Sequence, residues 1–166
     1  MNQSIFLTKY AFHSLVSNLL ELEESISVIL DEFCPGPSTE AEELKQILND
    51  YLRRMDDTLR NISITETAKN EFPFVIVNSE VMIEETASLG VYRNKLISPL
   101  KDRVEVNEIS FLSPMGKALL LKNVKDNIVV EMPGGDFHYK ILSVRIIGDL
   151  KSSRFTSSLM KASSNG

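Results

Sequence analysis

The sequence is poor in the residues that build most disulfide, redox and metal sites. It has one cysteine, Cys34, and two histidines, His13 and His138, among 166 residues. A lone cysteine excludes an internal disulfide, and the three residues together are too few for a typical zinc cluster. We therefore expect a protein of a reducing, cytoplasmic compartment, with no metal or other cofactor of its own.

Long apolar runs and nucleotide-binding motifs are also missing. No stretch approaches the roughly 18 uncharged residues of a membrane-spanning helix, and residues 1–5 lack a basic segment leading into an apolar one. The sequence contains no Walker loop, no GxGxxG and no HExxH motif. We expect a soluble protein that contacts no membrane and is not an enzyme in its own right.

Charge is present but unevenly distributed. The net charge of −5 disfavours direct nucleic-acid binding, which usually requires a basic face. Residues 1–71 hold 6 Lys and Arg against 13 Asp and Glu, whereas residues 72–166 hold 12 against 10. The chain therefore divides into an acidic half and a slightly basic half.

Two amphipathic helices are predicted in the acidic half. Apolar residues recur at steps of three and four, the spacing of a coiled-coil seam, at Leu15, Leu19, Leu22, Ile26, Ile29 and Phe33 and again at Leu44, Leu48, Tyr51, Met55, Leu59 and Ile62. Thr8 can cap the first helix, and Ser38 or Thr39 the second. The Pro-Gly-Pro break at 35–37 separates them. An antiparallel hairpin follows, with an arm of roughly 35–40 Å that we expect to project.

Acidic side chains gather at the bend of this hairpin. Residues 31–43 contain no Lys or Arg, and their acids are Asp31, Glu32, Glu40, Glu42 and Glu43. One interpretation is a solvated cluster in which three acids favour the N-terminus of the second helix. The other is an acidic tip that meets a cation or a basic channel.

A compact β-rich domain is predicted for the second half. Residues 63–72 are a candidate linker, and a β-branched run begins at 72–77, followed by strands near 81–85, 90–97, 104–109, 128–131 and 137–147. Ser113 and Pro114 are typical of a helix start, here for a short helix over 115–122. The Pro-Gly-Gly-Asp segment at 133–136 predicts a hairpin turn. The serine-rich end predicts a flexible tail over 151–166.

Two segments of the second half carry a family resemblance. They are ISFLSPMGKALL at 109–120 and DNIVVEMPGG at 126–135, followed by YKI at 139–141. Over about residues 74–147 the chain resembles the C-terminal domain of the GreA/GreB family, bacterial transcript-cleavage and elongation factors that bind RNA polymerase. The resemblance implies an α+β fold: an N-terminal antiparallel coiled-coil hairpin at 1–66, then an FKBP-like β-rich domain with one short helix at 72–150.

The resemblance also implies roles for the hairpin tip and for one loop. In the family the tip enters the polymerase secondary channel, where an Asp and a Glu of the motif Gly-Asp-Leu-Ser-Glu-Asn help to hold Mg²⁺. The loop at Ser113, Pro114 and Met115 corresponds to the family's polymerase-docking surface. RNA polymerase is thus the implied partner, with nucleic acid contacted only indirectly through the transcription complex.

The tip departs from the family motif. The comparable stretch here is Gly-Pro-Ser-Thr-Glu-Ala at 36–41, so Glu40 matches the glutamate but Pro37 replaces the aspartate. The arms are also shorter than in the cleavage factors, and residues 75–81 are similar to the regulator of nucleoside diphosphate kinase, a relative with a short hairpin. We therefore expect a polymerase-binding elongation regulator with doubtful cleavage activity, in which Glu40 is the candidate contact to the polymerase Mg²⁺.

Two other functions stay open at this point. The first is a true cleavage stimulator in which Glu40 acts with Glu42 or Asp31. The second is an FKBP-like prolyl isomerase or scaffold that uses the hairpin to dimerise. The isomerase requires an aromatic-lined pocket, whereas the chain has no Trp and 7% aromatic residues.

Overall fold

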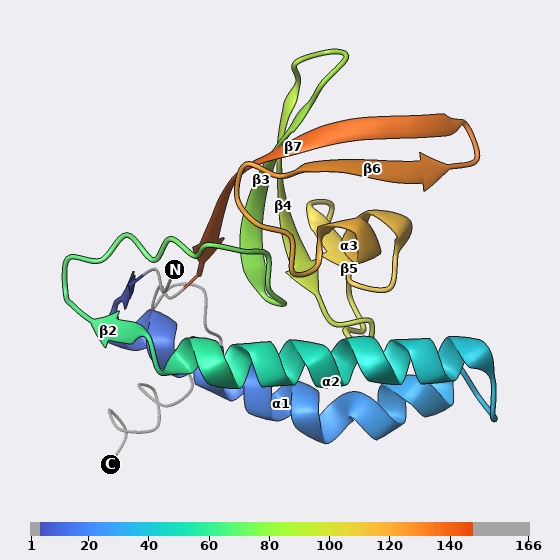
Figure 1. Ribbon diagram of the computed structural model, residues 1–166, viewed down its shortest axis with the longest axis horizontal. Helices are drawn as coiled ribbons and strands as arrows, with labels where there is room; N and C mark the ends of the chain where they lie inside the picture. Colours follow the sequence, from blue (N-terminus) through green and yellow to red (C-terminus); the bar gives the residue numbers. More distant parts are fainter. Residues whose placement is uncertain (1–3, 148–166) are drawn as a thin grey trace.

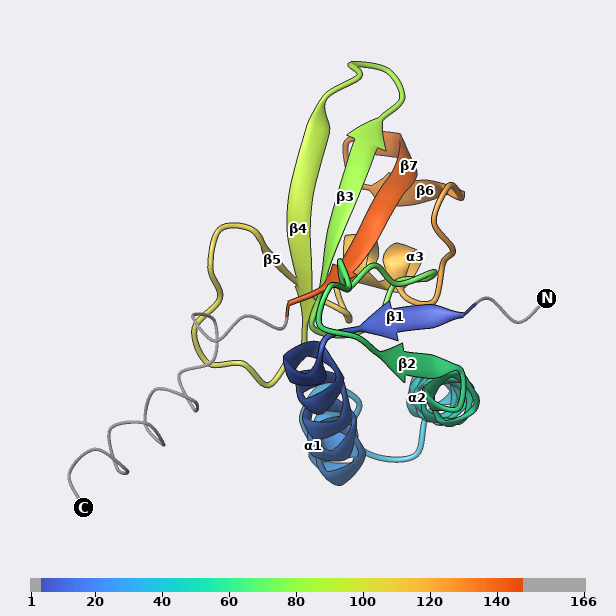
Figure 2. The ribbon, with the colours of Figure 1, turned by 90° about the vertical axis from the view of Figure 1, so that its left-hand side faces the viewer.

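The computed structural model describes residues 4–147 and confirms the predicted fold class. A helical hairpin is followed by a curled five-stranded sheet with one short helix, and the sheet stands over the hairpin (Figures 1 and 2). The hairpin lies within the predicted range 1–66, and the five strands lie within 72–150. The predicted tail at 151–166 falls outside the described residues. No helix in residues 4–147 is long and apolar enough to cross a membrane.

The predicted caps delimit both arms of the hairpin. Helix α1 spans Lys9–Phe33, and the Thr8 side chain accepts a hydrogen bond from the Ala11 N–H. Helix α2 spans Thr39–Leu59 and is capped in the same way by Ser38. Between them, Gly36 has a φ of +83°, a backbone conformation that few residues other than glycine adopt, so the Pro-Gly-Pro sequence makes a tight turn.

The apolar stripes form the contact between the helices. Their buried members are Ala11, Leu15, Leu22 and Ile29 on α1 and Leu44, Leu48, Tyr51 and Met55 on α2. Phe33, the last predicted stripe position on α1, is instead exposed, because α1 ends there. Burial of one shared stripe holds two helices that would be marginal alone.

A small parallel sheet at the open end of the hairpin was not predicted. Strand β1 (Ile5–Leu7) pairs with β2 (Ile62–Ile64), so the residues that lead into α1 lie beside those that follow α2. Part of the expected linker at 63–72 is therefore β-structure.

The larger sheet has the strand order β5-β4-β3-β7-β6. Its elements are β3 (Ser79–Glu85), β4 (Val91–Ile97), β5 (Glu108–Ser110), β6 (Asn127–Met132) and β7 (Gly135–Ile146), with helix α3 (Pro114–Leu119) between β5 and β6. The turn between β6 and β7 lies where it was predicted, and Gly135 there has a φ of +126°, which requires glycine.

Two predicted elements of the β domain differ in their bounds, and the β-branched run that precedes the strands is not itself a strand. Residues 72–77 do not form a strand, since Pro73 offers no N–H to a ladder and only isolated bridges form at Glu71 and Phe74. Residues 104–107 form a loop, and the strand begins at Glu108. Helix α3 ends at Leu119 rather than at 122, because Leu121 adopts a positive φ of 66°.

The hairpin and the β domain share one core, so the arm projects less freely than expected. The Tyr51 hydroxyl on α2 accepts a hydrogen bond of 3.0 Å from the buried Val77 N–H. The Arg54 guanidinium lies 3.9 Å from the centre of the Phe74 ring and donates to the Leu121 carbonyl at 3.1 Å. Figure 1 shows α2 running beneath the β domain, with the bend at its far end.

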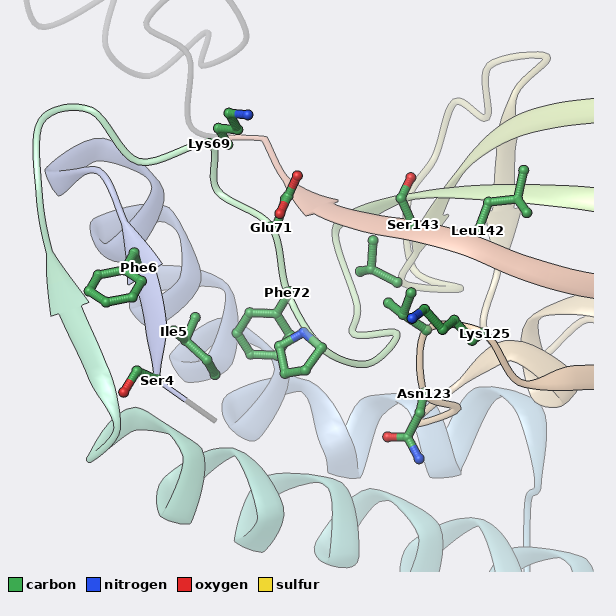
Figure 3. A pocket seen from close by; sticks show the side chains of 13 residues that line it. Ser4, Ile5, Phe6, Lys69, Glu71, Phe72, Asn123, Lys125, Leu142 and Ser143 are labelled. Atoms are coloured by element: carbon green, nitrogen blue, oxygen red, sulfur yellow. The ribbon is translucent and has the colours of Figure 1, made fainter. Parts of the chain in front are cut away.

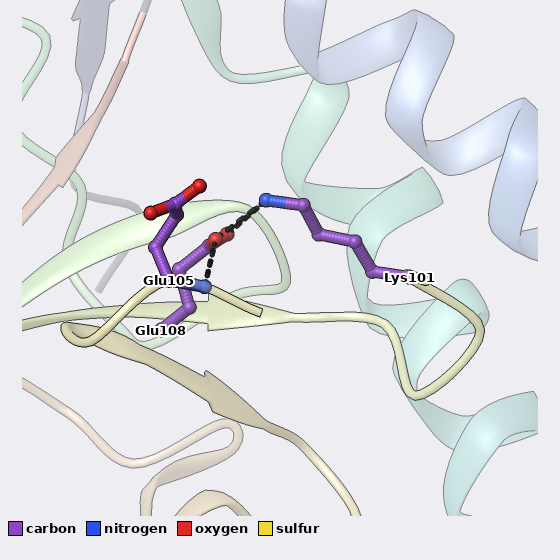
Figure 4. A network of polar contacts seen from close by, with 3 residues as sticks. All are labelled: Lys101, Glu105 and Glu108. Atoms are coloured by element: carbon purple, nitrogen blue, oxygen red, sulfur yellow. Dashed lines mark hydrogen bonds and ion pairs between the residues drawn. The ribbon is translucent and has the colours of Figure 1, made fainter. Parts of the chain in front are cut away.

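A buried carboxylate anchors the loop before β5. Glu108 accepts hydrogen bonds from the Lys101 ammonium and from the Glu105 N–H (Figure 4). Burial alone raises the pKa of Glu108, but the Lys101 and Glu105 hydrogen bonds and the charges of Lys101 and Lys95 outweigh it, so the pKa is lowered overall. The folded protein therefore favours the ionised form.

This lowered pKa predicts a loss of stability in acid. The ionised Glu108 stabilises the fold above the unfolded-state pKa of about 4.3, and this contribution disappears as the pH falls through the lower folded-state pKa. Glu108→Gln should cost about 1–2 kcal/mol at pH 7 and progressively less below about pH 4. Urea unfolding across this range measures the difference. Glu105→Gln is the control, since only the backbone of Glu105 takes part; an equal effect there would contradict the assignment.

Candidate hairpin-tip site

The bend brings acids from two helices to one end of the molecule. Asp31 and Glu32 lie in the last turn of α1, and Glu40, Glu42 and Glu43 lie at the start of α2. All five side chains are exposed, as predicted. The structure thus places the five acids together at the bend, on the two arms of a capped turn.

The acidic region extends well beyond the bend. Residues 10–44 contain no Lys or Arg, and besides the five tip acids they include Glu21, Glu23 and Glu24. Among residues 4–147, none of the ion pairs involves a tip acid. The outer part of the hairpin therefore presents negative charge that the described residues do not neutralise, and such a surface attracts a basic partner.

The two arms differ in what these acids do for the fold. Glu40 and Glu42 sit in the first turn of α2, where the positive end of the helix dipole stabilises them. Asp31 and Glu32 sit at the negative end of α1, whose last turn has no basic residue. A helix N-terminus therefore accounts for the first pair of acids, whereas the second pair lowers the stability of α1.

The tip does not form a metal site by itself. Within the described residues, no group of three or more His, Cys, Asp or Glu side chains is arranged to hold a metal ion. Cys34, next to the turn, is half-buried and packs against the apolar core. Any cation at the tip would take its remaining ligands from water or from a partner.

The second candidate surface is the loop that starts α3. The Ser113 hydroxyl donates to the Ser110 carbonyl at 2.7 Å and accepts from the Gly116 N–H at 3.0 Å. Pro114 is exposed in the first turn, while Ser113 is half-buried and Met115 packs partly against the core. Of the three predicted docking residues, Pro114 is the one freely accessible.

Gly116 explains why this loop is rigid. A Cβ atom there would lie 2.0 Å from the Ser110 carbonyl oxygen and 2.7 Å from the Phe111 Cα. Only glycine allows α3 to approach the preceding segment so closely. The Ser-Pro-Met-Gly sequence therefore builds a fixed edge on the β domain.

The sequence patterns did not predict that two residues of α2 connect the hairpin to the β domain. Tyr51 was assigned to the hairpin stripe and Arg54 was given no role, yet both contact the β domain. Arg54 also donates to the Asn123 side-chain oxygen at 3.2 Å, and burial lowers its pKa. The only signal in the sequence was an arginine three residues after a stripe position, and its hydrogen-bond partners lie more than 60 residues further along the chain.

One cavity of about 670 Å³ lies at the opposite end, beside β1 and β7. Lys125 and Glu71 line it together with Phe72 and Asn123 (Figure 3). None of the predicted site residues belongs to its lining. The cavity is therefore separate from both candidate surfaces.

The β domain matches a known protein family. Residues 69–146 match the family described as "Transcription elongation factor, GreA/GreB, C-term". The transcription elongation factor GreA of Solidesulfovibrio magneticus is 30% identical over 110 residues, which are 66% of this chain and 67% of that protein. The same factor from Syntrophomonas wolfei is 27% identical over 153 residues, 86% of this chain and 96% of that protein.

Two solved structures also contain chains similar to this one. The GreA factor homolog 1 of Thermus thermophilus is 22% identical, with 86% of this chain and 99% of that chain covered and a TM-score of 0.38. The GreA/GreB factor of Nitrosomonas europaea is 20% identical, with 86% and 98% covered and a TM-score of 0.42.

Proposed function

Because this chain belongs to the GreA/GreB family of transcription elongation factors, we propose that it binds RNA polymerase and places its acidic hairpin tip in the polymerase secondary channel. The observation that carries this proposal is the position of Asp31 and Glu32. These acids oppose the dipole of α1 and have no ion-pair partner among residues 4–147, so the fold itself gains nothing from them. A basic partner surface supplies a reason for their presence.

The physical basis of insertion is a stiff, like-charged arm. Helix α1 has 25 residues and is about 38 Å long at the usual helical rise. A negative arm is steered towards a basic channel, and the effect weakens as salt screens it. The β domain docks outside the channel through the edge at Ser113, Pro114 and Met115, where the capped turn holds Pro114 exposed.

Under this proposal the factor acts through the polymerase and has no active site of its own. Glu40 is the candidate contact to the polymerase Mg²⁺, because it is exposed at the start of α2 and carries the hard oxygen ligands that Mg²⁺ takes. Pro37 offers no second carboxylate. The main effect is therefore occupation of the channel, and cleavage is weak.

Cleavage stimulation is the second candidate function, favoured by the exposed Glu42 and Asp31 close to the bend. These acids replace the missing aspartate only if one of them reaches the same cation as Glu40. The isomerase alternative gains no support from the cavity beside β1, which contains lysine, glutamate and asparagine side chains as well as apolar ones.

Neutralising the acids at the end of α1 tests the proposal. Asp31→Asn with Glu32→Gln should weaken polymerase binding several-fold at low salt, since it removes two charges from the tip. The same change should stabilise the isolated protein by about 0.3–1 kcal/mol, since it removes two unfavourable dipole contacts. Competition binding to polymerase and urea unfolding measure the two effects.

A matched pair elsewhere on α1 provides the control. Glu23→Gln with Glu24→Gln changes net charge equally but leaves the end of the helix intact. It should lower polymerase affinity less than the tip pair and should not raise stability. Equal polymerase affinity for all three proteins would refute insertion of an acidic tip.

A further inference from the structure

The two edges of the five-stranded sheet are protected very differently. At one edge β5 has three residues, and its first residue, Glu108, carries a buried carboxylate that accepts a hydrogen bond from Lys101 (Figure 4). At the other edge β6 has six residues, Asn-Ile-Val-Val-Glu-Met, with no proline or lysine. Natural edge strands are usually short, charged, interrupted by proline or covered. Helix α3 lies next to β6 (Figure 1), and Glu131 is the one charged residue of the strand, but by length and composition β6 is the less protected edge.

The hydrogen-bonding groups of β6 support this description. In an antiparallel ladder, alternate residues of an edge strand direct their N–H and C=O groups away from the neighbouring strand. Met132 pairs with Gly135 across the turn, so the outward set is Asn127, Val129 and Glu131. In residues 4–147, no backbone hydrogen bond from outside the sheet reaches this set.

We propose that the β6 edge is a self-association surface, on which β6 of a second copy of this chain pairs antiparallel about a two-fold axis at Val129. This register places Val129 opposite its own equivalent and Ile128 opposite Val130 of the second copy. Asn127 then lies opposite Glu131 of the second copy. The Val129 pair lies on the axis and occurs once, whereas the other two pairs each occur twice.

The sequence of β6 is complementary to itself in this register. The Asn127 amide can donate to the Glu131 carboxylate of the second copy, and no two like charges face each other. Val129 is 49% exposed and Met132 is 39% exposed, so pairing covers apolar surface that is otherwise in water. A single strand pair buries less than the roughly 1,200 Å² of a standard stable interface, so the dimer is weak.

The net charge sets how the dimer responds to salt. Each copy carries −5, and the acidic hairpins repel one another. Added salt screens this repulsion and should strengthen the association. This inference does not rest on the proposed function, because it is argued from β6 and uses none of the hairpin-tip residues.

Sedimentation equilibrium of the full chain over a wide concentration range provides the test. The mean mass should rise from the 18.7 kDa of one chain towards twice that value. Val129→Lys places two ammonium groups opposite each other and should raise the dissociation constant by about tenfold or more. Val129→Thr keeps a β-branched side chain and should change it little. A wild type that stays monomeric throughout, or a Val129→Lys variant that associates like the wild type, would overturn the proposal.

Substitutions of Asn127 test the register. Asn127→Lys should strengthen association at low salt, because the new ammonium faces Glu131 of the second copy. Asn127→Asp should weaken it, because two carboxylates then face each other. Equal constants for both variants would refute this pairing. If the wild type is monomeric and Val129→Lys instead loses affinity for polymerase, the edge receives a polymerase segment and self-association is refuted.

Discussion

Replacing Tyr51 by alanine is expected to lower the free energy of unfolding by about 3–5 kcal/mol, the usual cost of removing a large buried aromatic side chain. Tyr51 is 1% exposed and lies where α2 meets the β domain. Its loss leaves a cavity between the two parts and deprives the buried Val77 N–H of its acceptor. Urea unfolding followed by circular dichroism measures the change.

Two further substitutions separate packing from hydrogen bonding. Tyr51→Phe retains the ring and should cost about 1–2 kcal/mol, the penalty for one unsatisfied buried donor. Tyr10→Ala, at a 52% exposed position on α1, should cost less than about 0.5 kcal/mol. If Tyr51→Ala were as mild as Tyr10→Ala, the hairpin and the β domain would not share one core.

The second large effect concerns transcript cleavage. We expect the wild type to stimulate little cleavage of backtracked RNA, and Pro37→Asp to increase the rate on the order of a hundredfold, because a second carboxylate then joins Glu40 near the polymerase Mg²⁺. Pro37 is exposed and precedes the Ser38 cap, so the substitution leaves α2 its start signal. A stalled, backtracked elongation complex with Mg²⁺ provides the assay.

Pro35→Asp is the matched control for this experiment. It adds the same charge on the other side of Gly36, at a position that does not correspond to the aspartate of the family motif. It should leave cleavage unchanged. Rapid cleavage by the wild type at equal occupancy would show that the existing acids suffice, and no cleavage by any variant would identify the length of the arm as limiting.

The hairpin could be predicted well from the sequence because its signals are local. The caps at Thr8 and Ser38 act within three residues, and the seam repeats every three or four. The same apolar spacing places the tip acids outside the buried stripe and so predicted their exposure. The position of Asp31 and Glu32 against the dipole of α1 also depends only on where that helix ends.

Two of the missed features depend on contacts between residues far apart in the sequence. The β1–β2 sheet pairs Ile5 with Ile62, and two strands of three residues carry almost no periodic signal. The start of β5 depends instead on a local contact, in which the Glu108 side chain accepts a hydrogen bond from the Glu105 N–H and a turn replaces the expected strand. The contact of Arg54 with Phe74 depends on how α2 meets the β domain. No local sequence pattern predicts this contact between α2 and the β domain.

Cross-linking from Cys34 tests the central claim most directly. This is the chain's single cysteine, and it lies beside the hairpin turn, so a photoreactive group attached to it reports where the tip sits in the polymerase complex. The account predicts cross-links to residues that line the secondary channel, and fewer of them in the Asp31→Asn, Glu32→Gln variant. A bound factor whose Cys34 cross-links only to the outer surface of the polymerase would contradict it.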